Sequence, residues 1–258
     1  MKLSIIIPAH NEELRLPPVL EQYAQYYGDK FGDDVEIIVV VNGSTDNTLE
    51  LTKAFAGNHP IVSVINEPRR VGKGGAVMMG LRQARGELVG FVDADGSTAP
   101  QDYYDLVAKI GEAGCIIASR WMKESVVEPK QPLSRRLASR IFNSMVNLFF
   151  GFRVHDTQCG AKLFRRDVID SILPEIGITK WAFDVDMLFC VRRHGYRIVE
   201  IPTVWRDAAG SKVQVGRAST EMAIAMIRLR LIYSPFKWVV TLYNKLVRMI
   251  RRCAPGKR

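Results

Sequence analysis

Glu87-Leu88-Val89-Gly90-Phe91-Val92-Asp93-Ala94-Asp95 is a short apolar run that ends in two carboxylates one residue apart. Its length and its β-branched and aromatic residues are typical of a strand covered by helices on both faces of a parallel sheet. Ligands of such sheets bind at the carboxyl ends of the strands. In an extended segment Asp93 and Asp95 project to the same side, and their oxygens suit Mg²⁺ or Mn²⁺ beside a phosphate. The stretch therefore predicts a site for a metal-bound nucleotide.

The residues that follow allow a second interpretation. Asp95-Gly96-Ser97-Thr98-Ala99-Pro100 is rich in turn-forming residues, so the two aspartates can also belong to an ordinary surface turn. An isolated Asp-x-Asp pattern does not decide between a turn and a ligand site. The decision depends on the rest of the chain.

Strand-like and helix-like segments alternate along the chain, which is typical of an α/β fold with a mainly parallel central sheet flanked by helices. A chain of 258 residues can bury a full core, and we expect one domain with an appendage. The expected strands are residues 2–7, 35–41, 61–65, 87–93, 115–118 and 198–204, and the expected helices are residues 12–27, 46–56, 74–84, 100–113, 133–150 and 183–194.

Polar loops follow three further predicted strands, at residues 8–12, 42–48 and 69–75. Any one of them has a simpler explanation, because Asn11 and Asp46 can be helix N-caps and the glycines can be turn residues. Four such loops at one edge of a sheet favour a shared ligand. Gly74 follows Lys73, so the loop is not a Walker A motif, and no Gly-x-Gly-x-x-Gly follows the first strand.

The order of these motifs resembles family 2 glycosyltransferases with the GT-A fold, and among them the polyprenyl-phosphate (dolichyl-phosphate) glucosyl and mannosyl synthases. The resemblance covers residues 1–212. It implies Mg²⁺ or Mn²⁺ at Asp93 and Asp95, and it places a catalytic carboxylate at Asp184. Ser97 stands where mannosyl synthases often have Gln, which leaves a third metal ligand and the sugar open. The implied donor-binding residues are Pro8, Ala9, Asn11, Glu12, Asn42, Asp46, Lys73, Asp93, Ala94, Asp95, Arg206 and Lys212.

The same resemblance divides the catalytic domain into a donor half, about residues 1–119, and an acceptor half, about residues 120–212. Arginine forks suit phosphate oxygens, although a helix with several arginines can also be an ordinary solvated face. The sequence does not distinguish Arg135 from Arg136, since both stand near the start of the same predicted helix. The implied residues that bind a lipid phosphate are Arg120, Arg135, Arg136, Arg140 and Gln158.

These observations predict an inverting, metal-dependent enzyme that transfers glucose or mannose from a UDP- or GDP-hexose to a polyprenyl phosphate. A phosphate acceptor is already ionised, so we expect Asp184 to position a substrate rather than to act as a strong base. One alternative is a family 2 enzyme acting on a sugar hydroxyl of a glycan, with Asp184 as base. Another is a non-catalytic nucleotide-sugar binder at a membrane surface.

The basic charge of the chain lies in its last segment. The formal net charge is +9, and 11 of the 36 Lys and Arg residues follow residue 210, against Glu221 as the only acid there. This distribution favours a local anionic membrane surface over nucleic acid. The four cysteines lack metal-ligand spacing, and neither a signal peptide nor an uncharged apolar run of membrane-spanning length is found. We expect peripheral or interfacial attachment to the cytoplasmic face of a membrane.

Residues 213–258 are therefore expected to form two amphipathic helices that lie on the bilayer, separated at Ser234-Pro235. In a helix over residues 236–252 the cations fall on one side and the apolar residues on the other. The alternative is a basic amphipathic helix that docks on the catalytic domain or on a second subunit.

Truncation after Ser234 tests this expectation. It should reduce sedimentation with anionic liposomes and make the remaining binding less sensitive to salt, because each Lys or Arg near an anionic surface contributes about 1 kcal/mol. Sedimentation equal to that of the full chain would favour the docked helix instead.

Overall fold

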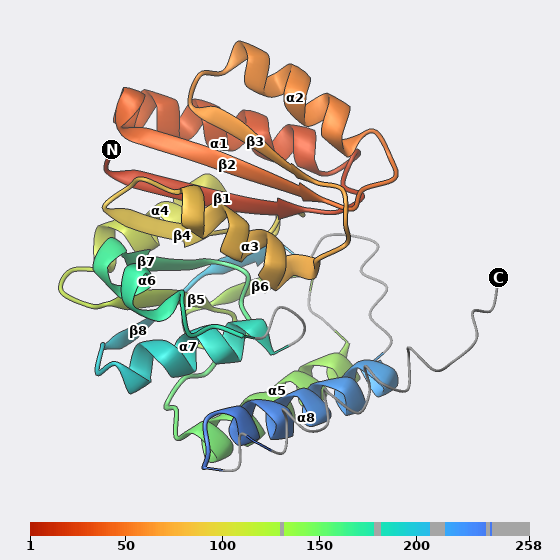
Figure 1. Cartoon of the computed structure of the whole chain (residues 1–258), viewed down its shortest axis with the longest axis vertical. Coiled ribbons are helices and arrows are strands. Elements are labelled where there is room, and N and C mark those ends of the chain that lie inside the picture. Colours follow the sequence, from red (N-terminus) through yellow and green to blue (C-terminus); the bar gives the residue numbers. More distant parts are fainter. Residues whose placement is uncertain (130–131, 178–181, 207–214, 236–237, 239–258) are drawn as a thin grey trace.

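The computed structural model describes residues 1–129, 132–177, 182–206, 215–235 and 238. Its centre is a seven-stranded sheet in the order β3-β2-β1-β4-β7-β5-β8, with helices on both faces (Figure 1). A second, two-stranded sheet pairs β6 with β9. The strands are β1 (Leu3–Ala9), β2 (Val35–Asn42), β3 (Val62–Glu67), β4 (Leu88–Phe91), β5 (Cys115–Ser119), β6 (Val126–Glu128), β7 (Lys162–Arg165), β8 (Ile198–Pro202) and β9 (Val204–Arg206).

The first four strands run parallel and end at one edge of the sheet. Every residue of β2 is buried, and β1 is buried except at Pro8, as expected of strands that helices cover on both faces. In the register Ala9 lies opposite Val41, and Ile6 lies opposite Phe91. The loops after β1, β2 and β4 therefore leave the sheet next to one another, which confirms the predicted α/β fold.

Strand β7 departs from the expected topology. It lies between β4 and β5 and is antiparallel to both, with Gly90 opposite Leu163. The pattern did not predict it, because β7 has only four residues and follows directly on a polar stretch. The expected strand at residues 198–204 is divided into β8 and β9, which belong to different sheets.

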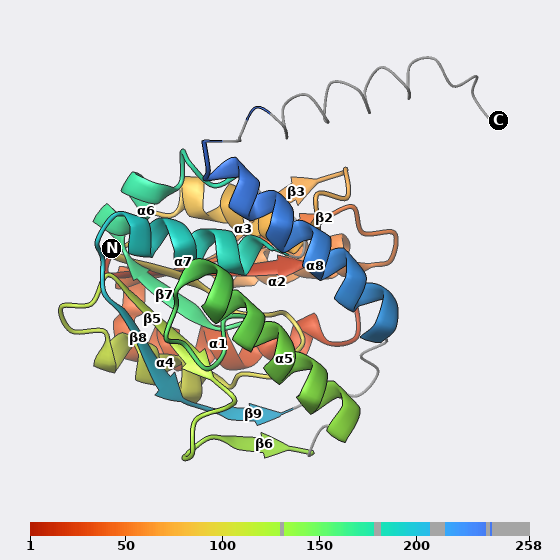
Figure 2. The ribbon, with the colours of Figure 1, turned by 90° about the horizontal axis from the view of Figure 1, so that it is seen from below.

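Helices α3, α6 and α7 cover one face of the sheet, and α1 and α4 cover the other (Figures 1 and 2). Each face has its own apolar core; Phe164 and Leu81 belong to one, and Tyr23 and Tyr103 belong to the other. The helices are α1 (Leu16–Phe31), α2 (Thr48–Asn58), α3 (Gly72–Gln83), α4 (Pro100–Lys109), α5 (Leu133–Phe150), α6 (Arg166–Ile172), α7 (Phe183–Arg193) and α8 (Val215–Ile232).

Two of the expected boundaries that were wrong lie beside the predicted site. The first helix begins at Leu16 instead of residue 12, because Asn11 has a φ of 55° and two prolines begin the helix. Strand β4 ends at Phe91, so Asp93 and Asp95 lie on the turn that follows and not on the strand. Asp95 accepts a hydrogen bond from the backbone N–H of Ser97 at 3.0 Å, which holds this turn.

Helices α5 and α8 lie side by side along one end of the molecule (Figures 1 and 2). Met226 and Leu229 of α8 are buried in the core, whereas Ile224 and Ile227 are 62% and 57% exposed. The first tail helix thus packs on the catalytic domain through one side. The division of the chain at residue 212 stays a prediction, and the expected helix over residues 236–252 lies outside the described residues.

In the described part of the chain, none of the helices combines the length and the apolar character that crossing a membrane would require.

The position of β7 makes Gly90 a sensitive residue. A Cβ at Gly90 would overlap the carbonyl oxygen of Lys162 and the hydroxyl of Tyr103. Gly90→Ala should lower the free energy of unfolding by about 2 kcal/mol, as overpacking of a filled core does. Gly57→Ala is the matched control: Gly57 lies in α2 with no heavy atom within 4 Å, so alanine should stabilise by up to about 1 kcal/mol. Urea unfolding measures both, and equal midpoints would contradict the packing.

Candidate active site

A cavity of about 260 Å³ lies where β1, β2 and β4 end. Eight of the predicted donor-binding residues line it, and their role in binding a donor stays a prediction. The structure adds four further residues to it: His10, Arg15, Arg70 and Gly72. The predicted residues in the lining are Pro8, Ala9, Glu12, Asn42, Lys73, Asp93, Ala94 and Asp95.

We call this first cavity the donor cavity, after the predicted residues that line it. An ion pair between Lys73 and Asp93 lies in it, with Nζ and Oδ1 2.6 Å apart. Burial raises the pKa of Asp93; Lys73 opposes this rise, and the charge of Asp95 adds to it. Burial would lower the pKa of Lys73, but the carboxylates of Asp93 and Asp184 outweigh burial and raise it. Lys73 therefore stays a cation, in a place where it can bind a phosphate.

Three predicted donor-binding residues form hydrogen bonds between the loops around the cavity, and one of them, Asn42, also lines it. Asn42 donates from Nδ2 to the Ala9 carbonyl at 2.9 Å and accepts from the Gly72 N–H at 3.2 Å, which joins three loops. Asn11 accepts from the Thr45 N–H at 2.8 Å. Asp46 accepts from the N–H groups of Glu13 and Thr48 at 3.2 and 3.1 Å. Asn11 and Asp46 do not line the cavity, and their interactions fix loop positions.

The carboxylates of Asp93 and Asp95 fit a hard divalent cation. Both line the open donor cavity, and Mg²⁺ is usually held by one or two carboxylates together with substrate phosphates and water. Within the described residues, no group of three or more His, Cys, Asp or Glu side chains is placed to hold a metal. A cation held by Asp93 and Asp95 would complete its coordination with water or with a bound phosphate.

The segment from Asp156 to Lys162 connects the two halves of the site. A Cβ at Gly160 would overlap the carboxylate of Asp93, so this glycine permits the segment to lie against the donor cavity. Lys162 is fully buried, and its Nζ bonds Oδ1 of Asp184 at 2.6 Å. Burial alone would raise the pKa of Asp184, but Lys162 and Lys73 outweigh it and hold the pKa below its usual range. Asp184 is therefore an ionised, paired carboxylate.

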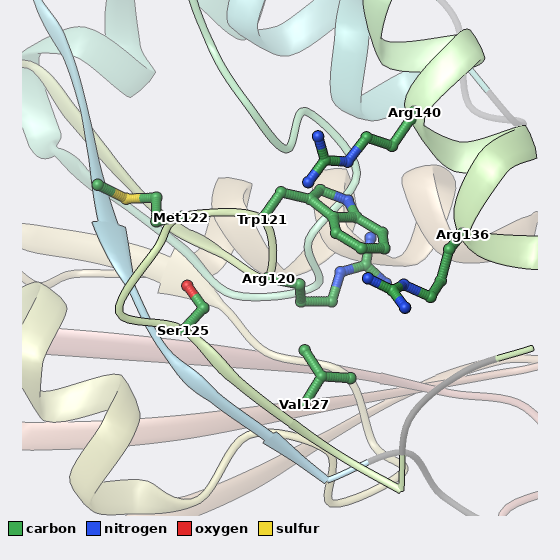
Figure 3. Close-up of a pocket in the computed structure, with 7 residues that line it drawn as sticks. All are labelled: Arg120, Trp121, Met122, Ser125, Val127, Arg136 and Arg140. Carbon is green, nitrogen blue, oxygen red and sulfur yellow. The ribbon is translucent and has the colours of Figure 1, made fainter. Parts of the chain in front are cut away.

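A second cavity, of about 250 Å³, contains three of the four predicted arginines and is called the acceptor cavity below. Figure 3 shows Arg136 and Arg140 of α5 extending toward Trp121 and Arg120. The lining residues are Arg120, Trp121, Met122, Ser125, Val127, Arg136 and Arg140. Gln158 is outside this lining, and the side chain of Arg135 lies outside the described residues.

Arg120 already has an anionic partner. Its Nε and Nη2 donate to the carboxylate of Asp156 at 2.7 and 3.0 Å, and the Asp156 side chain is 3% exposed. The guanidinium also lies 5.0 Å from the ring centroid of Trp205. Arg120 is thus held in place by a buried ion pair, whereas Arg136 and Arg140 are exposed to the cavity.

The remaining predicted residues lie apart from both cavities or outside the description. Arg206 reaches Asp102 of α4 at 3.6 Å and is 59% exposed, and Lys212 lies outside the described residues. Arg15 and Arg70 were not predicted as donor-site residues. Arg70 belongs to the same glycine-rich loop as Lys73, and its place in that loop could have identified it as a donor-site residue. Arg15 pairs with Glu12, with Nε and Oε2 2.6 Å apart.

The sequence of the chain matches the family model described as glycosyl transferase family 2 over residues 4–173. A dolichyl-phosphate beta-glucosyltransferase of Dictyostelium discoideum is 32% identical over 92% of this chain and 76% of its own length. The enzyme of the same name from Saccharomyces cerevisiae is 32% identical over 90% of this chain and 75% of its own length. The chain belongs to glycosyl transferase family 2 and is a glycosyltransferase.

Solved structures show the same fold. Glucosyl-3-phosphoglycerate synthase from Mycobacterium tuberculosis, in complex with UDP, superposes with a TM-score of 0.67 at 19% identity, covering 91% of this chain and 82% of that one. The mannosyltransferase of Pyrobaculum calidifontis, in complex with GDP-Man and Mn²⁺, gives 0.60 at 22% identity, covering 89% of this chain and 63% of that one. At these identities the likeness concerns the fold, which is the GT-A type.

The contact between Gly160 and Asp93 generates a prediction. Gly160→Ala should displace the Asp93 carboxylate and weaken binding of a nucleoside diphosphate at least tenfold, while thermal unfolding changes little. Gly177→Ala is the control, because a Cβ there meets no heavy atom within 4 Å. Calorimetric titration with UDP and GDP in the presence of Mn²⁺ measures the effect, and unchanged affinity in the Gly160 variant would refute the role of this contact.

Proposed function

We propose that this enzyme transfers a glucosyl group from a nucleoside diphosphate glucose to the phosphate of dolichol or a related polyprenol. The support from sequence is the set of relatives at about 30% identity over most of the chain, which are named dolichyl-phosphate beta-glucosyltransferases. Those names favour glucose over mannose, which the sequence alone left open.

One structural observation carries the proposal: the segment from Asp156 to Lys162 touches both cavities. Gly160 packs on Asp93 of the donor cavity, and Asp156 holds Arg120 of the acceptor cavity. Burial would lower the pKa of Arg120, but Asp156 and, more weakly, Asp93 raise it, so the two sites interact electrostatically. A donor diphosphate and an acceptor phosphate bound in these cavities are therefore neighbours.

The reaction needs an oxygen of the acceptor phosphate to attack the anomeric carbon in line while the bond to the nucleoside diphosphate breaks. Arg136 and Arg140 bind the acceptor phosphate, and Arg120 adds positive charge at the base of the cavity. Asp93 and Asp95 would hold a divalent cation, which would supply positive charge to the leaving diphosphate. Lys73 supplies further positive charge to that diphosphate.

Asp184 acts by position in this scheme. Its carboxylate is paired with Lys162 and its pKa is lowered, so it is a weak base. A phosphate acceptor has no proton that must be removed, and the arrangement therefore suits phosphate better than a sugar hydroxyl.

The function is tested with a panel of radiolabelled UDP- and GDP-hexoses and a short polyprenyl phosphate. We expect label from UDP- or GDP-glucose in the lipid extract, in a β linkage. Label that stays in water as free sugar, or appears only on added glycans, would overturn the proposal.

The acceptor cavity generates a further prediction. Arg136→Ala should lower kcat/KM for the lipid phosphate at least tenfold and spare donor affinity, because a lost hydrogen bond to a charged group costs about 1.5–3 kcal/mol. Arg136 is the cleaner position, since Arg120→Ala would leave Asp156 buried without its cation.

Arg82→Ala is the matched control, because Arg82 is an exposed arginine in the last turn of α3. Steady-state kinetics with varied lipid at saturating donor measures the change. Equal lipid kinetics for the Arg136 variant and this control would place the acceptor phosphate elsewhere.

A further inference from the structure

A third cavity, of about 300 Å³, borders the acceptor cavity and has no part in the proposed reaction. It shares only Trp121 and Arg140 with the acceptor cavity. We call it the Arg153 cavity. Its lining residues are Trp121, Arg140, Asn143, Ser144, Asn147, Arg153, Val154 and His155.

The charges of the Arg153 cavity favour an anion. Arg140 and Arg153 are exposed, and in the part of the chain that the structure describes no carboxylate pairs with either. None of the lining residues is acidic. The Arg140 guanidinium lies 5.4 Å from the ring centroid of Trp121, which holds it at the border of the two cavities. Two guanidinium groups without a carboxylate are well suited to a phosphate.

Two of the lining residues each carry a polar atom that is buried from solvent and lacks a hydrogen-bond partner. The atoms are Nε1 of Trp121 and Oδ1 of Asn147, two of the four buried side-chain polar atoms without a partner among the described residues. The Asn147 amide orientation is fixed, because Nδ2 donates to the Val154 carbonyl at 2.8 Å. Unpaired buried polar atoms are costly and rare. Both atoms are closed to solvent, so the groups that a ligand of this cavity meets first are the exposed arginines.

The rim of the cavity is apolar on the outer side of α5. Arg140, Ser144 and Asn147 line the cavity at helical spacing. Ile141 comes directly after Arg140 in the chain, and Leu148 comes directly after Asn147. Ile141 is 53% exposed and Leu148 is 83% exposed. A molecule whose phosphate enters the cavity therefore meets an apolar strip directly outside it. This combination fits an amphiphile with an anionic head.

We propose that the Arg153 cavity binds the headgroup of an anionic membrane phospholipid, such as phosphatidylglycerol. The phosphodiester lies between Arg140 and Arg153. The acyl chains lie along Ile141 and Leu148. This site borders the acceptor cavity and shares Arg140 and Trp121 with it, but its lipid is not a substrate of the proposed transfer reaction.

Calorimetric titration of the full chain with dihexanoyl phosphatidylglycerol, kept below its micellar concentration, tests the proposal without the general attraction of a charged surface. We expect saturable binding of one lipid. Dihexanoyl phosphatidylcholine, which has no net charge, should not compete. Glycerol phosphate should bind at least tenfold more weakly, because it lacks the acyl chains. Equal binding of phosphatidylcholine or of glycerol phosphate would overturn the assignment to a phospholipid.

Two variants test the location of the site. Arg153→Gln removes a cation, and Ser144→Asp adds a negative charge at an exposed position of the lining; each should weaken the lipid about tenfold. Lys53→Gln, which removes an exposed cation of α2, is the matched control and should bind as the unaltered chain does. Thermal unfolding reports whether each variant keeps its fold. Unchanged affinity in both cavity variants, or no saturable binding to the unaltered chain, would refute the site.

Discussion

The buried ion pair of Lys162 and Asp184 is the interaction on which the site depends. Lys162 is fully buried, and its ammonium group contacts the Asp184 carboxylate and the Cys159 carbonyl, each at 2.6 Å. Removing one partner of such a pair leaves an uncompensated buried charge, which costs about 3–5 kcal/mol. The pair therefore ties the start of β7 to the first turn of α7. It thereby holds Gly160 against Asp93 and sets Asp156 beside Arg120.

The carboxylates of the site are balanced by cations one by one. Asp93 pairs with Lys73, Asp156 with Arg120, and Asp184 with Lys162. Asp95 differs, because in the described part of the chain its carboxylate is bonded by the Ser97 backbone N–H and by no lysine or arginine. Asp95 thus lines the donor cavity without an ammonium or guanidinium partner, whereas Asp93 in the same cavity has Lys73. This unbalanced negative charge supports the proposed divalent cation at Asp93 and Asp95.

The sequence located the donor cavity well, because parallel strands deliver their following loops to one edge whatever the exact ends of the strands. The loops containing Pro8, Asn42, Lys73 and Asp93 were recognisable from local patterns of apolar runs and turn residues. The sequence could not show that Asn11 and Asp46 form hydrogen bonds to neighbouring loops instead of lining the cavity, because both roles require the same polar side chains. Strand β7 was not predicted, because its pairing with β4 and β5 joins residues far apart in the sequence and leaves no local pattern.

The central position of β7 also affects how the chain folds during synthesis. The strands β1 to β4 are complete by residue 91, but the neighbour of β4 is made only at residues 162–165. Until then β4 is an open edge whose backbone N–H and C=O groups have no partner on one side. Chains with such late, distant pairings fold slowly and expose edges that can aggregate. Ribosome-bound chains shorter than about residue 165 are thus the stage at which this protein most needs a chaperone.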